Sequence, residues 1–216
     1  MSTPETETTF TLIGITVSVH YEDYLSFCLT NAQVLDHWYV VVDPTDKPTI
    51  EMLQNIPNVT LIHFDFQKGG YVFNKSGGIY TAQKLVHATY PHAWVLLVDS
   101  DIVLPLDLRQ KLLESNLNPE GLHGAARAFY QTPQQLLEDK PVSTKDRGCW
   151  GFFHLYYDKT KFCPESSKDA ARYDDKFKAI FGHHRTRVLP IMVKHLGDEA
   201  CNWKGRKSKR FEIVKS

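Results

Sequence analysis

Residues 94–103 read WVLLVDSDIV, five apolar residues followed by two aspartates, Asp99 and Asp101, that stand one residue apart. An apolar run of this length is typical of a strand that is buried on both faces of a parallel sheet. In such a sheet, ligands bind outside the carboxyl ends of the strands. The two carboxylates therefore predict a site where a divalent metal is held against a diphosphate. The alternative is a turn with two solvated acids, because a D-x-D pattern alone is common.

Strands and helices alternate around this stretch. The same patterns predict strands at 10–19, 38–42, 59–66, 122–130, 151–157 and 189–194, helices at 20–35, 49–54, 77–88 and 170–181, and a loop at 195–206. Continuous apolar strands between helices indicate a mainly parallel sheet that is covered on both faces. We therefore expect a single α/β domain over residues 1–216, with a regular first half and a looser second half.

Composition excludes several classes of protein. A hydrophobic content of 42% with 12% aromatic residues is that of a globular chain rather than a disordered or collagen-like one. No apolar run approaches the roughly 20 residues that cross a bilayer, and the N-terminus lacks the pattern of a secretory signal. A cytoplasmic protein is therefore expected. Its four cysteines form no C-x-x-C pair, so free thiols are expected rather than a zinc site or disulfides.

The net charge of zero hides an uneven distribution. Residues 1–66 carry nine acidic residues and one basic residue, whereas residues 67–216 carry 24 basic and 16 acidic residues. Overall neutrality disfavours a nucleic-acid-binding protein. The basic second part is nevertheless compatible with an anionic ligand.

Two segments carry a resemblance to a known family. The stretch FNKSGGIYTAQKLVHATYPHAWVLLVDSDIVLP (73–105) resembles the centre of GT-A-fold, nucleotide-sugar-dependent glycosyltransferases, in which a buried strand leads into a DXD motif. The later stretch VKHLGDEACNWKGR (193–206) resembles their C-terminal metal-binding loop. The resemblance is to small stand-alone domains of bacteria and large viruses (which would mean the host cytoplasm for a viral protein). It implies a GT-A-type Rossmann-like fold and sugar transfer from a nucleotide-diphosphate sugar, preferably a UDP-sugar, to a glycan hydroxyl.

The resemblance also implies a nucleotide and metal site. It divides the chain into a nucleotide-binding half (about 10–105), an acceptor half (about 106–206) and a basic tail (207–216). The implied nucleotide-binding residues are Val17, Ser18, Asp43, Lys75, Asp99 and Ser100, and the implied ligands of Mn²⁺ (or Mg²⁺) are Asp99, Asp101 and His195. An imidazole beside carboxylates suits Mn²⁺ better than Mg²⁺. Without the motif, His195 would be interpreted as an ordinary loop histidine and Lys75 as a surface lysine.

The second half supplies candidates for catalysis and for acceptor binding. Asp174 and Asp175 open a helix and resemble the acidic pair of inverting members, in which the second acid, here Asp175, is the base. They could also simply complement the helix dipole, and a retaining enzyme would need neither. Further candidates are Lys204 and Arg206 for the diphosphate, Gly197 and Gly205 for closure of the loop, and Trp150 and Arg127 for the acceptor. The alternative for the aromatic residues at 150–156 is a buried strand face.

Three other functions are compatible with parts of the sequence. VLLVDSDIV also fits the first motif of haloacid-dehalogenase-type phosphatases, with Asp99 as nucleophile, and Gly197-Asp198 with Asn202 resembles their late metal motif. Against this, three predicted strands precede the motif. A sugar-nucleotide pyrophosphorylase would carry a Gly-rich basic loop after its first strand, which VSVHYEDY (17–24) lacks. A non-catalytic nucleotide- or carbohydrate-binding module is the remaining alternative.

Overall fold

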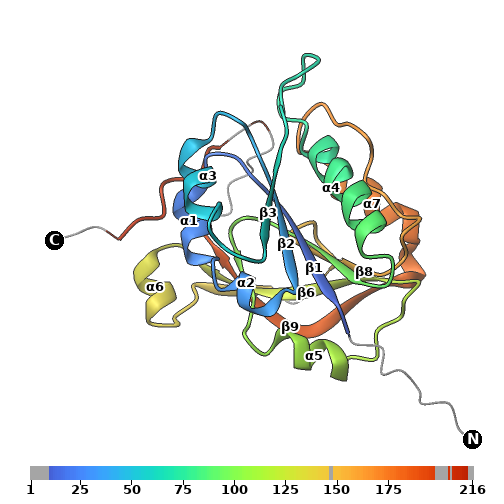
Figure 1. Cartoon of the computed structure of the whole chain (residues 1–216). Helices are drawn as coiled ribbons and strands as arrows, with labels where there is room; N and C mark the ends of the chain where they lie inside the picture. Colours follow the sequence, from blue (N-terminus) through green and yellow to red (C-terminus); the bar gives the residue numbers. More distant parts are fainter. Residues whose placement is uncertain (1–9, 146–147, 198–203, 205, 214–216) are drawn as a thin grey trace, which may run out of the picture.

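The apolar run that precedes the two aspartates forms strand β4 (Trp94–Val98), in a computed structural model that describes residues 10–145, 148–197, 204 and 206–213. β4 lies parallel to β1 (Leu12–Ser18), which pairs in parallel with β2 (His37–Val42), and β2 pairs in parallel with β3 (Val59–His63). The order β3-β2-β1-β4 brings the carboxyl ends of four strands to one edge of the sheet (Figure 1).

The second half extends the same sheet with mixed pairing. β8 (Phe153–Tyr156) is antiparallel to β4 and to β6 (Leu122–Tyr130), and β9 (Thr186–Leu196) runs parallel to β6. Two short strands complete the sheet: β5 (Ile102–Val103) pairs with β9, and β7 (Ser143–Lys145) pairs with β6. Ile102 lies opposite His195 in the β5–β9 ladder. This pairing brings the segment after the two aspartates to the end of β9.

Helices cover both faces of the sheet. α4 (Lys75–Thr89) and α7 (Tyr173–Phe181) pack on one face, and α1 (Glu22–Phe27), α2 (Asn31–Val34), α3 (Lys47–Leu53) and α5 (Leu108–Glu114) pack on the other (Figure 1). A hydrophobic core lies on each face of the sheet, and successive residues of β1 point to opposite faces. Leu12 packs in the core beside α1, and Ile13 packs in the core beside α4. The Rossmann-like α/β fold expected from the sequence is therefore confirmed.

Local departures from the expected elements have physical causes. The helix expected at 20–35 is split in two. Asn31 starts the second piece because its buried side chain donates to the carbonyl of Ile102 at 2.8 Å and accepts from the amide of Leu104 at 2.9 Å. His195, expected in a loop, lies within β9 because the strand continues to pair with β5 and β6. The short elements α5, α6 (Pro133–Leu137), β5 and β7 are not expected from the sequence.

The end of the described chain packs on α1 through one buried residue, while its basic side chains are exposed. In this segment (residues 206–213, the C-terminal strap), Phe211 is only 2% exposed. Its ring stacks on Tyr24 and meets Phe27 edge-on, with ring centroids 5.2 Å apart in both pairs. The basic side chains of Lys207, Lys209 and Arg210 are exposed, as expected of a basic tail, but Phe211 anchors this segment on α1. Among the described residues, no helix is both long and apolar enough to cross a membrane.

Candidate functional site

A cavity of about 660 Å³ opens at the carboxyl ends of β1, β2 and β4 and is closed on the other side by the second half of the chain. Most of the residues singled out from the sequence line it: Val17, Asp43, Lys75, Asp99, Ser100, Asp101, Arg127, Trp150, Asp174, His195, Lys204 and Arg206. Ser18 and Asp175 do not line it. Ser18 is instead buried, at 1% exposure, because it is the last residue of a strand covered on both faces.

Lys75 contacts Asp99 at the floor of the cavity. The Asn74 side chain caps α4 by accepting from the amide of Gly77 at 3.0 Å, which makes Lys75 the first helical residue. Lys75 Nζ lies 2.6 Å from Asp99 Oδ1 and 5.0 Å from the centre of the Tyr173 ring. Burial alone would lower the pKa of Lys75, but the charge of Asp99 outweighs it and the pKa is raised. The lysine therefore stays charged, and its ammonium is directed to Asp99.

Asp101 and His195 meet from the two halves of the chain. Asp101 Oδ1 lies 4.0 Å from His195 Nε2, and the Leu196 amide donates to the Asp101 carbonyl at 2.8 Å. Both side chains are largely buried, and neither Asp101 Oδ1 nor His195 Nδ1 has a hydrogen-bond partner among the described residues. Burial raises the pKa of the Asp101 carboxyl, although the nearby His195 opposes this effect. A buried carboxylate oxygen without a donor is suited to receive a cation or a donor from a ligand.

The donor set fits a metal ion in part. A carboxylate oxygen and an imidazole nitrogen are ligands that Mn²⁺ accepts, and Asp101 and His195 supply one of each. Asp99, the third expected ligand, has its Oδ1 bound to Lys75. Among the described residues, no three His, Cys, Asp or Glu side chains gather closely enough to hold a metal. Two of the three expected ligands are therefore suitably arranged, and the third is engaged by a lysine.

The acidic pair at the start of α7 is divided between the cavity and the solvent. Asp174 lines the cavity, and burial, followed by the like charge of Asp175, raises the pKa of its carboxyl. The Asp175 side chain is 61% exposed and lies 3.7 Å from Lys178. The sequence-based preference for Asp175 is thus reversed, because the first turn of α7 directs only Asp174 to the cavity.

Gly151 makes room for Asp174. A Cβ atom built on Gly151 would lie 2.6 Å from the Asp174 Cβ and 2.8 Å from its Oδ2. Since a Cβ position is set by the backbone, any side chain at 151 would displace the start of α7.

An aromatic wall stands beside this acid. Trp150 is 50% exposed and lines the cavity. The Arg127 guanidinium lies between the rings of Phe129 and Phe152, 4.7 Å and 4.6 Å from their centres. Phe152 and Phe153 are buried, as the alternative of a buried strand face predicts. Trp150 is therefore the aromatic residue of 150–156 that is exposed at the cavity, and Lys178 Nζ lies 5.7 Å from the centre of its ring.

The opposite end of the cavity lies between β1 and β2. Asp43 follows β2, and its Oδ1 accepts from the Thr45 amide at 2.9 Å and from the Thr45 hydroxyl at 2.6 Å. Residues that sequence reasoning missed also line this end: Val19, His20, Tyr21, Thr45, Phe66, Gln67, Val72 and Phe73. His20 and Tyr21 directly follow the first strand, so their place after a parallel strand was the signal that could have found them.

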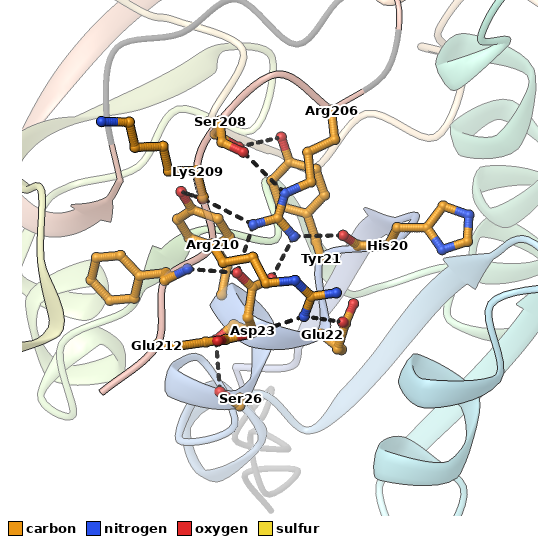
Figure 2. Close-up of polar contacts among 12 residues, drawn as sticks. His20, Tyr21, Glu22, Asp23, Ser26, Arg206, Ser208, Lys209, Arg210 and Glu212 are labelled. Carbon is orange, nitrogen blue, oxygen red and sulfur yellow. Dashed lines mark hydrogen bonds and ion pairs between the residues drawn. The ribbon is translucent and has the colours of Figure 1, made fainter. Parts of the chain in front are cut away.

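Arg206 lines the cavity, but its donors are already used (Figure 2). Both terminal nitrogens bond the Asp23 carboxylate at 2.6 Å. The remaining N–H groups donate to the carbonyls of His20 at 2.7 Å, Lys209 at 3.0 Å and Ser208 at 3.3 Å. A guanidinium has five N–H donors, and all five are engaged here. The expectation that Arg206 binds a diphosphate is therefore not supported, because its partners lie within the chain.

Gly197 follows β9 at a position where only glycine fits. Its φ is +85°, and a Cβ atom there would lie 2.5 Å from the Tyr24 hydroxyl oxygen. Lys204 lines the cavity and is exposed. Gly205, and Asp198 and Asn202 of the phosphatase alternative, lie outside the described residues.

Comparison with known proteins gives no family: no protein-family model matches the chain, and no curated protein matches it. Among similar solved structures, one is a proposed glucose-1-phosphate thymidylyltransferase from Bacillus anthracis in complex with sucrose. It has 10% identity, a TM-score of 0.47 and 87% of each chain covered. Another is a 4-diphosphocytidyl-2C-methyl-D-erythritol synthase, with 13% identity, a TM-score of 0.45 and coverage of 88% of this chain and 90% of that one. At these values the likeness does not extend to an activity.

Proposed function

We propose that the chain is a metal-dependent glycosyltransferase that moves a sugar from a nucleotide-diphosphate sugar, preferably a UDP-sugar, to a glycan hydroxyl. The main support is the meeting of Asp101 and His195, 4.0 Å apart, in a cavity at the carboxyl ends of parallel strands. Asp101 Oδ1 accepts no hydrogen bond from the part of the chain that the structure describes, so this pair is suited to a positive ligand. The sequence resemblance, which rests on the same two residues, supplies the reaction type.

Asp101 and His195 would hold Mn²⁺ (or Mg²⁺), with the diphosphate of the donor and Asp99 as further oxygen ligands. When bound, such an ion neutralises the charge that develops on the leaving diphosphate. Asp99 Oδ1 can join only if Lys75 moves from it, at 2.6 Å, to another anion, whereas no hydrogen bond is formed between Lys75 and Asp99 Oδ2. A phosphate of the donor is such an anion, so Lys75 would exchange Asp99 for the substrate. This exchange keeps the lysine charge compensated in both states.

Asp174 is the candidate base. An acceptor hydroxyl must lose a proton as it attacks, and a carboxylate with a raised pKa is a better proton acceptor than an ordinary one. Asp174 has this property because it is partly buried beside Asp175. Trp150, next to Gly151 on the same wall, would support the acceptor sugar. An inverting reaction follows from this assignment.

The products of three parallel assays test the proposal. The full chain is incubated with Mn²⁺ and a panel of nucleotide sugars, with a nucleoside triphosphate plus sugar 1-phosphate, and with a phosphomonoester. Release of UDP or another nucleoside diphosphate supports glycosyl transfer. Pyrophosphate from the second mixture indicates nucleotidyl transfer, phosphate from the third indicates a phosphatase that uses Asp99, and either result overturns the proposal.

Variants sharpen the outcome. Asp101→Asn should abolish metal-dependent UDP binding, and Asp174→Asn should lower turnover while UDP binding persists. Asp175→Asn is the comparison: its side chain is exposed and outside the cavity, so turnover should persist, and loss of its charge should only shift the pKa of Asp174 downward. Metal-dependent UDP binding without transfer to any acceptor would favour the non-catalytic module.

A further inference from the structure

His20 has a backbone conformation that side chains disfavour. It follows β1 directly and has a φ of +57°, in the left-handed region where glycine or asparagine is usual. Two contacts hold it there. Its amide donates to Asp46 Oδ2 at 2.6 Å, and its carbonyl accepts from Arg206 Nη1 at 2.7 Å. A strained residue that is held from both sides is a frequent feature of binding sites.

His20 lines the cavity. The side chain is 62% exposed and is part of the wall that also contains Val17 and Asp43. Its Nδ1 lies 3.7 Å from the fully buried Asp46 carboxylate, which also caps α3. Figure 2 shows the His20 carbonyl turned toward Arg206, with the ring on the opposite side. The peptide groups of His20 are therefore used to hold the residue, while its ring stays exposed in a residue that lines the cavity.

The contact that holds the His20 carbonyl comes from the C-terminal strap. Arg206 is fixed by Asp23, whose side chain is only 2% exposed and also accepts from the Phe211 amide at 2.6 Å. The Tyr24 hydroxyl donates to the Lys209 carbonyl at 2.8 Å, and its ring stacks on Phe211. The strap thus packs behind His20, although it is more than 180 positions away in the sequence.

We propose that His20 contacts the nucleoside diphosphate in this cavity and that Arg206 is a positioning residue, through which docking of the strap and ligand binding are coupled. The identity of the ligand rests on the proposed function. The contact itself is inferred from the place of His20 in the cavity wall, which also contains Asp43, a residue expected from the sequence to bind the nucleotide. Coupling between two binding equilibria is reciprocal, so a docked strap favours the ligand and the ligand favours a docked strap.

The first test separates backbone strain from ring contact. His20→Gly removes both the strain and the ring, and His20→Asn keeps a residue that tolerates the left-handed region but lacks the ring. We expect His20→Gly to unfold at the same or a higher temperature than the parent, while both variants bind UDP with Mn²⁺ about ten-fold more weakly by calorimetry. Unchanged affinity in both variants would overturn the contact. If the parent chain binds no nucleotide at all, the proposed function fails, and this inference fails with it.

The second test concerns the strap. Arg206→Lys cannot reproduce the fork that bonds Asp23 and His20 together, and Phe211→Ala removes the apolar anchor. Each should weaken UDP affinity several-fold at temperatures where the protein is fully folded. Ile213→Ala is the control, because Ile213 lies on the same strap but is 61% exposed, so its side chain is not an anchor as Phe211 is.

Hydrogen exchange provides a readout that a merely structural strap would not change. The Phe211 amide, which donates to Asp23, should exchange more slowly when UDP and Mn²⁺ saturate the full chain. A strap with only a structural role would lower the thermal midpoint in Phe211→Ala without changing UDP affinity, and ligand would leave exchange at Phe211 unchanged. Either observation, in a parent that binds UDP, would refute the coupling and leave the proposed function standing.

Discussion

Replacement of Gly197 by alanine tests how tightly the end of β9 is packed on α1. Gly197 has a φ of +85°, and a methyl group there would lie 2.5 Å from the Tyr24 hydroxyl oxygen and 2.6 Å from its Cε1. A left-handed backbone costs a residue with a Cβ about 1–2 kcal/mol. Overpacking against a fixed ring costs about 1–3 kcal/mol more. Tyr24 cannot easily turn aside, since its ring stacks on Phe211 and its hydroxyl bonds the Lys209 carbonyl.

We therefore expect Gly197→Ala to lower the free energy of unfolding by about 2–5 kcal/mol. Gly70 is a matched control because its φ is +83° and a Cβ there would have no atom within 4 Å. Gly70→Ala should lose only the conformational part, about 1–2 kcal/mol. Urea unfolding followed by tryptophan fluorescence measures both. Equal losses in the two variants would refute the reasoning, because they would mean that Tyr24 yields to the methyl group at no cost.

Three further predictions follow from the site and the strap. Gly151→Ala should lower turnover at least ten-fold through displacement of Asp174, with UDP affinity unchanged in calorimetry; a variant with normal turnover would exclude Asp174 as the base. The rate of sugar transfer should fall as pH decreases through the raised pKa of Asp174, because the protonated acid cannot accept a proton, and Asp174→Asn should lose that acid limb in a pH–rate profile. Asp23→Asn should cost about 3 kcal/mol of stability in urea unfolding, since it leaves the Arg206 charge without its partner.

The Asp23 variant also has a pH signature. Burial opposes ionisation of Asp23, but bonds from Arg206 and the Phe211 amide outweigh it and lower its pKa. A carboxyl whose pKa is depressed in the folded state adds stability above its unfolded pKa, and this stability is lost as pH falls through the depressed value. The parent should therefore lose stability below the ordinary range of aspartate titration more steeply than Asp23→Asn does. Parallel pH–stability curves for the two proteins would contradict this.

Much of the fold was predictable because the signals were local. The apolar strands 38–42 and 94–98 have no competing periodicity, and their alternation with helices determines the parallel half. The edge of the sheet at which Asp99 and Asp101 lie followed from the same rule. The local environment of these two aspartates could not be predicted. The hydrogen bond from Lys75 to Asp99 depends on the exact start of α4, which is capped by Asn74.

Features that depend on distant contacts were predicted wrongly or missed. The side chain of Asn31 divides a helix because its partners are Ile102 and Leu104, more than 70 residues away. The basic composition after residue 206 correctly suggested exposed side chains at 207, 209 and 210, but the packing of Phe211 on aromatic residues of α1 was missed. The sequence could only rank Asp174 and Asp175 as candidates. Successive residues of a helix point in different directions, so the orientation of α7 decides which of the two acids faces the cavity.

The strap has a consequence for the order in which the protein acquires its structure. Strands β1 to β4 are close together in sequence and can pair early. Helix α1 lies in the same part of the sequence, but its aromatic face is covered by Phe211 and the charge of its Asp23 is paired with Arg206. During synthesis, Arg206 and Phe211 leave the ribosome long after strands β1 to β4 and helix α1. The nascent chain therefore exposes an apolar patch and a charge in a half-finished core, and contacts of such long sequence separation form slowly. We expect the first half of the protein to reach its final packing after translation of the strap, in one step with the second half.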